Sequence, residues 1–168
     1  GQPNVRFAML DGDGNSVYTD GGLTTCSSRP CHRPAITWTG TNFGIAYIHG
    51  GVSEDDIRLL RLDGDGNLVG SVTYVDDFTG DSAQFPDIAW SGSDFGVTYK
   101  AGGFFDSEIF WRRVTPAGNL PGPSFALTGL TGVMSTEPAI CWSGTGFGIA
   151  YRSDVDGNRE IYQTEVLY

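Results

Sequence analysis

The sequence predicts an all-β fold, and three observations support that prediction. Glycine accounts for 25 of the 168 residues, aromatic residues make up 12% and charged residues only 18%. This composition favours short strands and tight turns over long helices. Apolar residues alternate with period two in several segments, and none shows the 3.6-residue period of an amphipathic helix. The third observation is an internal repeat of 52 residues, which makes residues 1–168 one repeat domain.

The repeat is clearest in three segments that begin at Pro34, Pro86 and Pro138. Each reads Pro-x-Ile-x-Trp-x-Gly-x-x-Phe-Gly-Ile/Val-x-Tyr, and the spacing between them is kept without insertion. The sequence LDGDGN also recurs at this spacing, over 10–15 and 62–67. A register held over the whole chain indicates that each repeat forms the same structural unit.

Each repeat is expected to form four strands, A to D. In the first repeat, strand A contains Ile36 and Trp38, and strand B contains Phe43, Ile45 and Tyr47 alternating with Gly and Ala. Strand B therefore has one large face and one small face, and a neighbouring sheet can approach the small face closely. Strand C is predicted over 57–62, 109–114 and 161–166, and strand D over 71–75 and 124–127, with a weakly apolar counterpart near 18–23.

Four antiparallel strands in a unit of about 50 residues form the pattern of a β-propeller blade. The chain begins and ends within a repeat, so it supplies about three and a quarter blades, or thirteen strands. The alternative fold is a β-trefoil. A trefoil closes three units of four strands on itself, and a strand C repeated at both ends of the chain would be redundant in it. The predicted units are strands C and D of a partial blade (1–33), two complete blades (34–85 and 86–137), and strands A to C of another (138–168).

The repeated motif resembles bacterial β-propeller repeats that continue into a hairpin with Asp-x-x-Gly-Asn. The resemblance covers nearly the whole chain and implies the propeller fold. It implies no particular activity, because propellers include enzymes, lectins and scaffolds.

The cysteines indicate the compartment. Cys26 and Cys31 lie in one loop of the first repeat, at positions without cysteine in the other copies. Their spacing favours a small disulfide, which predicts an extracellular or cell-surface protein. Free thiols and a metal site that includes His32 are the alternatives. Cys141 takes a strand A position held by Thr or Ala elsewhere, so we expect a small buried core residue.

Two Asp-Gly-Asp-Gly-Asn segments, 11–15 and 63–67, place carboxylates at i and i+2 as calcium loops do. The third copy, 115–119, contains no carboxylate at an otherwise equivalent turn. We therefore favour turns in which Asp accepts backbone hydrogen bonds. No cofactor is expected, with calcium as the open alternative.

The loops between strands B and C contain acceptor side chains at i and i+2 in repeat register. In a propeller these loops and the D–A loops gather at one end, which predicts a sugar- or cation-binding face. The alternative is a solvated rim. Three aromatic residues outside the repeated pattern add contact surface, whereas Trp38, Trp90 and Trp142 are expected in the core between blades. The predicted ligand-binding residues are Glu54, Asp56, Asp106, Glu108, Phe104, Phe105, Trp111, Arg152, Asn158 and Glu160, and the candidate metal ligands are Asp154 and Asp156.

Charge and motifs limit the function. The net charge is −10 and there is one lysine, Lys100, so nucleic acid and anionic membranes are not expected partners. The two histidines, His32 and His49, stand in no known catalytic motif. A secreted or surface binding module, lectin-like and with a glycan as ligand, is therefore favoured over an enzyme. A structural module without a small ligand and a glycoside hydrolase are the alternatives.

The expected partner is a second copy of the chain. An incomplete ring would expose the apolar faces of its terminal blades, which a soluble protein must cover. We predict a homodimer that forms one ring of six blades, with a fragment of a single larger propeller as the alternative.

Overall fold

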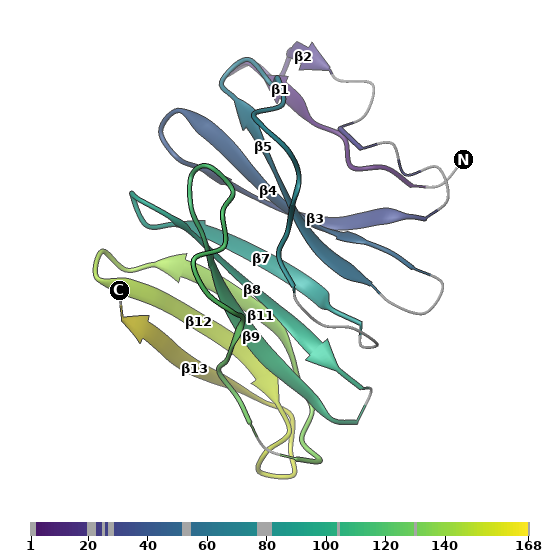
Figure 1. Cartoon of the computed structure of the whole chain (residues 1–168), viewed down its shortest axis with the longest axis vertical. Coiled ribbons are helices and arrows are strands. Elements are labelled where there is room, and N and C mark those ends of the chain that lie inside the picture. The colour runs from purple at the N-terminus through teal and green to yellow at the C-terminus, as the bar shows by residue number, and fades with distance from the viewer. Residues whose placement is uncertain are drawn as a thin grey trace.

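The computed structural model describes residues 3–19, 23–24, 26, 29–51, 55–76, 82–103, 105–129 and 131–167. Within these ranges the chain forms thirteen strands and no helix, which confirms the all-β prediction. It follows that the described part contains no helix able to span a membrane. The strands form four antiparallel sheets that follow one another from the N-terminal end to the C-terminal end of the molecule (Figure 1).

The two complete sheets have the predicted order A-B-C-D, with each strand hydrogen-bonded to the next. Their strand D is a short edge strand of two residues, shorter than predicted. The first sheet contains β3 (Cys31–Trp38), β4 (Asn42–His49), β5 (Asp56–Asp63) and β6 (Thr73–Tyr74). The second contains β7 (Gln84–Trp90), β8 (Phe95–Gly102), β9 (Ser107–Val114) and β10 (Phe125–Ala126).

The outer two sheets are incomplete, as the phase of the repeat predicts. The N-terminal sheet is a hairpin of strands C and D, and the C-terminal sheet contains strands A, B and C. The first strand begins three residues later than the repeat suggests, at Ala8 instead of Val5. These sheets consist of β1 (Ala8–Leu10) and β2 (Ser16–Thr19), and of β11 (Ser135–Trp142), β12 (Gly146–Ser153) and β13 (Glu160–Leu167).

The two Asp-rich segments form turns. Asp11 Oδ1 accepts hydrogen bonds from the backbone N–H groups of Asp13 and Asn15, at 3.0 and 2.8 Å. Asp63 makes the same two bonds to Asp65 and Asn67. The bonds from Asn15 and from Asn67 are the largest causes that lower the pKa of Asp11 and Asp63. In both segments the carboxylate closes the C–D turn, as the turn interpretation requires.

The core lies in the seams between consecutive sheets. The large face of strand B in each sheet packs against the small face of the sheet before it. A Cβ on Gly44 would lie 2.5 Å from the ring of Phe95, and one on Gly96 would lie 2.7 Å from the ring of Phe147. Glycine at these positions therefore allows the close approach of sheets that the sequence predicts.

Two buried arginines cross the seam between the two complete sheets in opposite directions. Arg61 donates to the carbonyls of Pro116 and Ser71, at 2.9 and 3.1 Å. Arg112 donates to the carbonyl of Val75 at 2.5 Å. Burial lowers the pKa of Arg61. The donors in these bonds are charged, and charge-assisted hydrogen bonds are stronger than neutral ones. They therefore add to the apolar contacts that hold the two sheets together.

The outer face of the last sheet corrects one prediction. Cys141 is a free and exposed thiol, although the sequence suggested a buried residue. It lies on the small face of the β11–β13 sheet, where Ile161 is also exposed. The equivalent residues of the second complete sheet, Ala89 and Ile109, are buried in the seam with the last sheet, so burial of Cys141 would require one more blade.

The repeated tryptophans pack beside the aromatic residue of strand B, with ring centroids 4.4 Å apart for Trp38 and Phe43. Trp90 and Trp142 make the same contact to Phe95 and Phe147, at 4.8 and 5.0 Å. The core prediction needs one correction, since Trp38 remains 47% exposed.

Candidate functional site

The first feature of the candidate site is a bulge at the start of each strand A. The residue before each repeated proline has a left-handed backbone, with φ of 51° at Arg33, 55° at Phe85 and 54° at Glu137. The pairing register of β3, β7 and β11 shifts at the same place. A residue before proline normally adopts an extended backbone, so each bulge stores about 1–3 kcal/mol of strain. Bulges re-aim side chains, which is often their role near functional sites.

These three bulges line one cavity of about 260 Å³, which we call the X-Pro cleft. The three A strands run beside one another, and this brings residues 52 apart in sequence together. The Arg33 guanidinium lies over the ring of Phe85, 4.3 Å from its centroid. The residues that line the cleft are Arg33, Pro34, Phe85, Pro86, Asp87, Glu137 and Pro138.

Two carboxylates and a second arginine set the charge of the cleft. Glu137 Oε2 lies 3.2 Å from Nη1 of Arg152. Asp87 accepts backbone hydrogen bonds at both oxygens, from Ile88 at 2.9 Å and from Ile140 of the next strand A at 2.8 Å. The bond to Ile140 joins β7 to β11 and orients the Asp87 carboxylate. The cleft thus combines an aromatic ring, a guanidinium and two oriented carboxylates.

The predicted loop residues lie at the same end of the sheets, and several of them fasten loops together. Asp106 Oδ1 accepts a hydrogen bond from the Gly132 backbone at 3.0 Å. Asp154 Oδ1 accepts one from the Met134 backbone at 2.7 Å. Glu108 accepts one from the hydroxyl of Thr128. Each bond joins a B–C loop, or the start of a strand C, to the segment between strands D and A.

The other predicted residues are dispersed. Asp156 Oδ2 accepts a hydrogen bond from the hydroxyl of Tyr162 at 2.5 Å. Phe105, Asn158 and Glu160 are exposed. Trp111 lies in the seam between the second complete sheet and the last sheet, with its ring centroid 5.8 Å from that of Phe147. Glu54 and Phe104 lie outside the described residues. Among the residues described, no three carboxylates come close enough together to hold a metal ion, so Asp154 and Asp156 gain no third carboxylate ligand.

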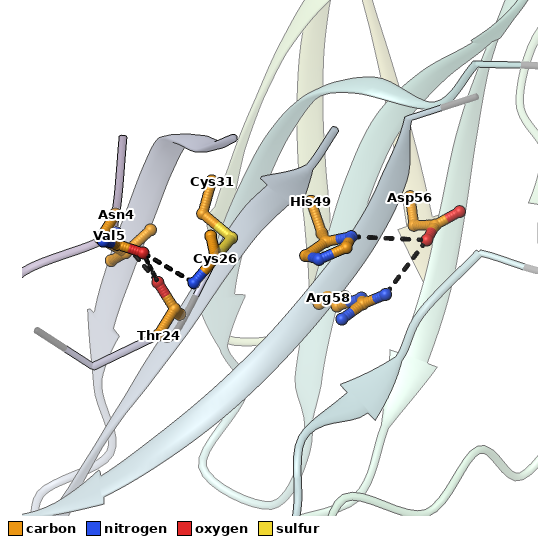
Figure 2. Close-up of a disulfide and its surroundings, with 8 residues drawn as sticks. All are labelled: Asn4, Val5, Thr24, Cys26, Cys31, His49, Asp56 and Arg58. Carbon is orange, nitrogen blue, oxygen red and sulfur yellow. Dashed lines mark hydrogen bonds and ion pairs between the residues drawn. A yellow bond between two sulfur atoms is a disulfide. The ribbon is translucent and has the colours of Figure 1, made fainter. Parts of the chain in front are cut away.

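The structure confirms the predicted disulfide between Cys26 and Cys31. Asp56 belongs to a small polar cluster near this disulfide. Its Oδ2 lies 3.3 Å from Nη2 of Arg58 and 3.9 Å from Nδ1 of His49 (Figure 2). Burial is the largest cause that lowers the pKa of His49, and the Arg58 charge is the second. This cluster lies on the first complete sheet and shares no residue with the lining of the X-Pro cleft.

Sequence reasoning found Arg152, which pairs with Glu137, but missed the residues that line the cleft. A signal was present, because the residue before each repeated proline is chemically different in the three copies, while the proline is constant. Arg33, Phe85 and Glu137 are therefore variable side chains on a constant backbone feature. Such a pattern is expected where one scaffold position is specialised for contact with a ligand.

Comparisons with known proteins place the fold. A scan against protein-family models finds no match, and neither does a search of curated proteins. Two solved structures are similar to the chain. One is a thermostable family-43 glycoside hydrolase, with 12% identity and a TM-score of 0.56 over 97% of this chain and 67% of that one. The other is an endo-arabinase from Bacteroides thetaiotaomicron, with 13% identity and a TM-score of 0.59 over 98% and 66%.

Both similar structures are five-bladed β-propellers. This chain is a partial β-propeller. The likeness confirms the predicted blade architecture and excludes the trefoil alternative, and at these identities it shows the fold alone. The chain spans about two thirds of the length of the structures that it matches.

Proposed function

We propose that this protein acts on a glycan, which binds in the X-Pro cleft and is hydrolysed there with the help of Glu137 and Asp87. The observation that supports this most directly is the convergence of three strained bulges on one cavity. The names of the two similar structures, a glycoside hydrolase and an endo-arabinase, support the same substrate class.

The chemistry of the cleft suits a sugar. The ring of Phe85 offers a flat apolar surface to the C–H face of a pyranose or furanose ring, and Arg33 lies against it. Glycoside hydrolysis generally uses two carboxyl groups that flank the scissile bond. Glu137 is assigned the proton transfer because its side chain is half exposed at the cleft. Asp87, held at both oxygens by backbone donors, is assigned the orienting and charge-stabilising part.

A glycan-binding module without hydrolysis is the second candidate, and one observation favours it. Both carboxylates are already engaged, Asp87 by two backbone N–H groups and Glu137 by Arg152. An engaged pair can still accept hydrogen bonds from sugar hydroxyls, yet it is less suited to moving a proton. An extracellular or cell-surface location fits either candidate, because a disulfide is most common in oxidising compartments.

A hydrolysis assay with matched variants separates the two candidates. The protein is incubated with arabinan and with a panel of other polysaccharides, and new reducing ends are measured. We expect E137Q to lower the rate by about 100-fold or more. E165Q, which changes an exposed carboxylate outside the cleft, should leave the rate unchanged.

Binding is measured in parallel by calorimetry with the same polysaccharides. F85A should remove binding if the ring is the sugar platform. Binding that depends on Phe85 without any release of reducing ends would establish the binding module. Binding that survives F85A would contradict the assignment of the cleft. The absence of both binding and hydrolysis with every polysaccharide tested would contradict it as well.

A further inference from the structure

A second set of residues with ligand chemistry lies around the disulfide of the first complete sheet. Cys31 on β3 is the direct cross-strand partner of His49 on β4. Cys26 reaches the same place through its bond to Cys31. The two sulfur atoms and a ring nitrogen of His49 all lie within 4.8 Å of one another. Figure 2 shows the His49 ring between the disulfide and the Asp56 carboxylate.

The surroundings of His49 are unusual for a histidine with no ligand role. Its Nδ1 is buried and makes no hydrogen bond to any described residue, and the carboxylate oxygen Oδ2 of Asp56 is 3.9 Å away. A buried polar atom without a partner has an unmet cost of desolvation, so it needs an explanation. A carboxylate on the side of the nitrogen that does not bind the metal is the usual means of orienting an imidazole, and Asp56 lies on the Nδ1 side. Nε2 would then be the nitrogen that binds the metal.

We propose that the Cys26–Cys31 disulfide masks a transition-metal site, and that its reduction creates a Cys₂His site for zinc from Cys26, Cys31 and His49. The pairing β3–β4 holds Cys31 and His49 together whether or not the disulfide is present, because six pairs of residues join these strands. Two thiolates and one imidazole form a donor set that zinc prefers, with a fourth position left for water.

The reaction balances with a dithiol as reductant. The dithiol gives two electrons and two protons to the S–S bond, which breaks into two thiols, and the reductant becomes a cyclic disulfide. Zinc then replaces the two thiol protons, which are released to solvent. Two thiolates neutralise the charge of Zn²⁺, so the buried site gains no net charge. Arg58 remains paired with Asp56 at 3.3 Å, so this charge is also balanced.

The structure selects His49 instead of the histidine nearest in sequence. His32 directly follows Cys31 on β3, so its side chain points to the opposite face of the sheet. Its cross-strand partner is Ile48, not a metal-binding residue. The pairing of two strands, and not the spacing along the chain, brings the third ligand to the cysteines. His32 therefore provides a matched control.

Cobalt titration tests the proposal, because cobalt bound to thiolates gives an intense charge-transfer absorption in the near ultraviolet. The C141S variant is used as the reference, which removes the exposed thiol. After reduction with dithiothreitol and its removal under argon, we expect one cobalt ion per chain, displaced by zinc. The oxidised protein should show no such band. H32A should bind as the reference does, and H49A, which keeps both thiolates but lacks the imidazole, should bind cobalt more weakly.

Two further measurements keep the test decisive. D56N should weaken zinc binding by about 10-fold through the loss of imidazole orientation. Zinc should raise the melting temperature of the reduced C141S protein but not that of reduced C141S/H49A. Because both proteins are reduced, this comparison remains valid even if reduction itself destabilises the fold. A reduced protein that gives no charge-transfer band and no zinc-dependent melting shift would overturn the proposal. Equal binding by H49A and the reference would overturn it as well.

Discussion

The seam between the second complete sheet and the last sheet, and the outer face of that last sheet, are built from the same repeat positions. Ile109 on β9 and Ile161 on β13 are 52 residues apart, yet 0% of Ile109 and 75% of Ile161 is exposed. Gly96 receives the ring of Phe147, whereas the nearest atom to a Cβ on Gly148 would be Sγ of Cys141, at 3.5 Å. Equivalent residues therefore have different environments at the two places.

This difference shows that the burial of a repeat position depends on the neighbouring sheet and not on the residue. The small face of strand B is shaped to receive an aromatic side chain of the next sheet, and in the last sheet it remains exposed. Such a face is a hydrophobic surface that a second copy or a further blade could cover. Matched substitutions at the two places measure how much stability each seam contributes.

The largest contrast is expected between I109A and I161A. Ile109 is buried among Phe147 and Ile149, so its truncation leaves a cavity and should lower the free energy of unfolding by about 2–5 kcal/mol. The same change at exposed Ile161 should alter it by less than about 0.5 kcal/mol. Urea denaturation of both variants measures the two values. A similar loss for I161A would mean that the outer face is covered in solution.

A smaller contrast is expected between G96A and G148A. A Cβ at position 96 would lie 2.7 Å from the buried ring of Phe147, so the sheets must separate, at a cost of about 1–3 kcal/mol. At position 148 the added methyl group meets only an ordinary contact, and the less flexible unfolded chain should make G148A neutral or slightly more stable. Thermal unfolding of the two variants decides the point, and an equally destabilised G148A would contradict it.

Cys141 reports directly on whether the outer face is covered. The predicted homodimer would place a second copy over this thiol, whereas in one chain the thiol is exposed. We expect its reaction with an aromatic disulfide reagent to slow as the protein concentration rises, while light scattering shows the mass rising toward two chains. A constant rate together with the mass of one chain at every concentration would rule out the homodimer at this face.

The smallest effect is expected for the hydrogen bond between Tyr162 and Asp156 in the last sheet. The complete sheets have Arg58 and Phe110 at the position of Tyr162, so they cannot repeat this bond. The hydrogen bond to Asp156 raises the pKa of Tyr162 from 10.0 to about 12. Because the folded pKa is the higher one, any stabilisation is present below pH 10 and is lost as the pH rises through about 12.

An alkaline titration followed by tyrosinate absorbance checks this contact. In D156N the pKa of Tyr162 should move back toward 10.0, because the hydroxyl loses its charged acceptor. Identical titration curves for D156N and the parent protein would show that the pair does not form in solution.

Much of the architecture could be predicted from local signals. Alternation in segments such as Phe43 to Tyr47 identifies strands, and the Asp-Gly-Asp-Gly-Asn segments identify turns, since both depend on side chains close in sequence. The disulfide was predictable because Cys26 and Cys31 are separated by a short loop. The order of strands within each sheet followed from the short connections between them.

The contacts that give the molecule its candidate sites depend on distances between sheets or strands. Arg33, Phe85 and Glu137 meet because three A strands lie side by side with a bulge in each, and His49 reaches the cysteines through the pairing of β3 with β4. Cys141 is exposed because no described sheet follows β11–β13, although its local sequence resembles that of a buried strand. Local propensity and period specify a strand and its two faces. What each face touches is set by the packing of whole sheets, which is a property of residues far apart in the chain.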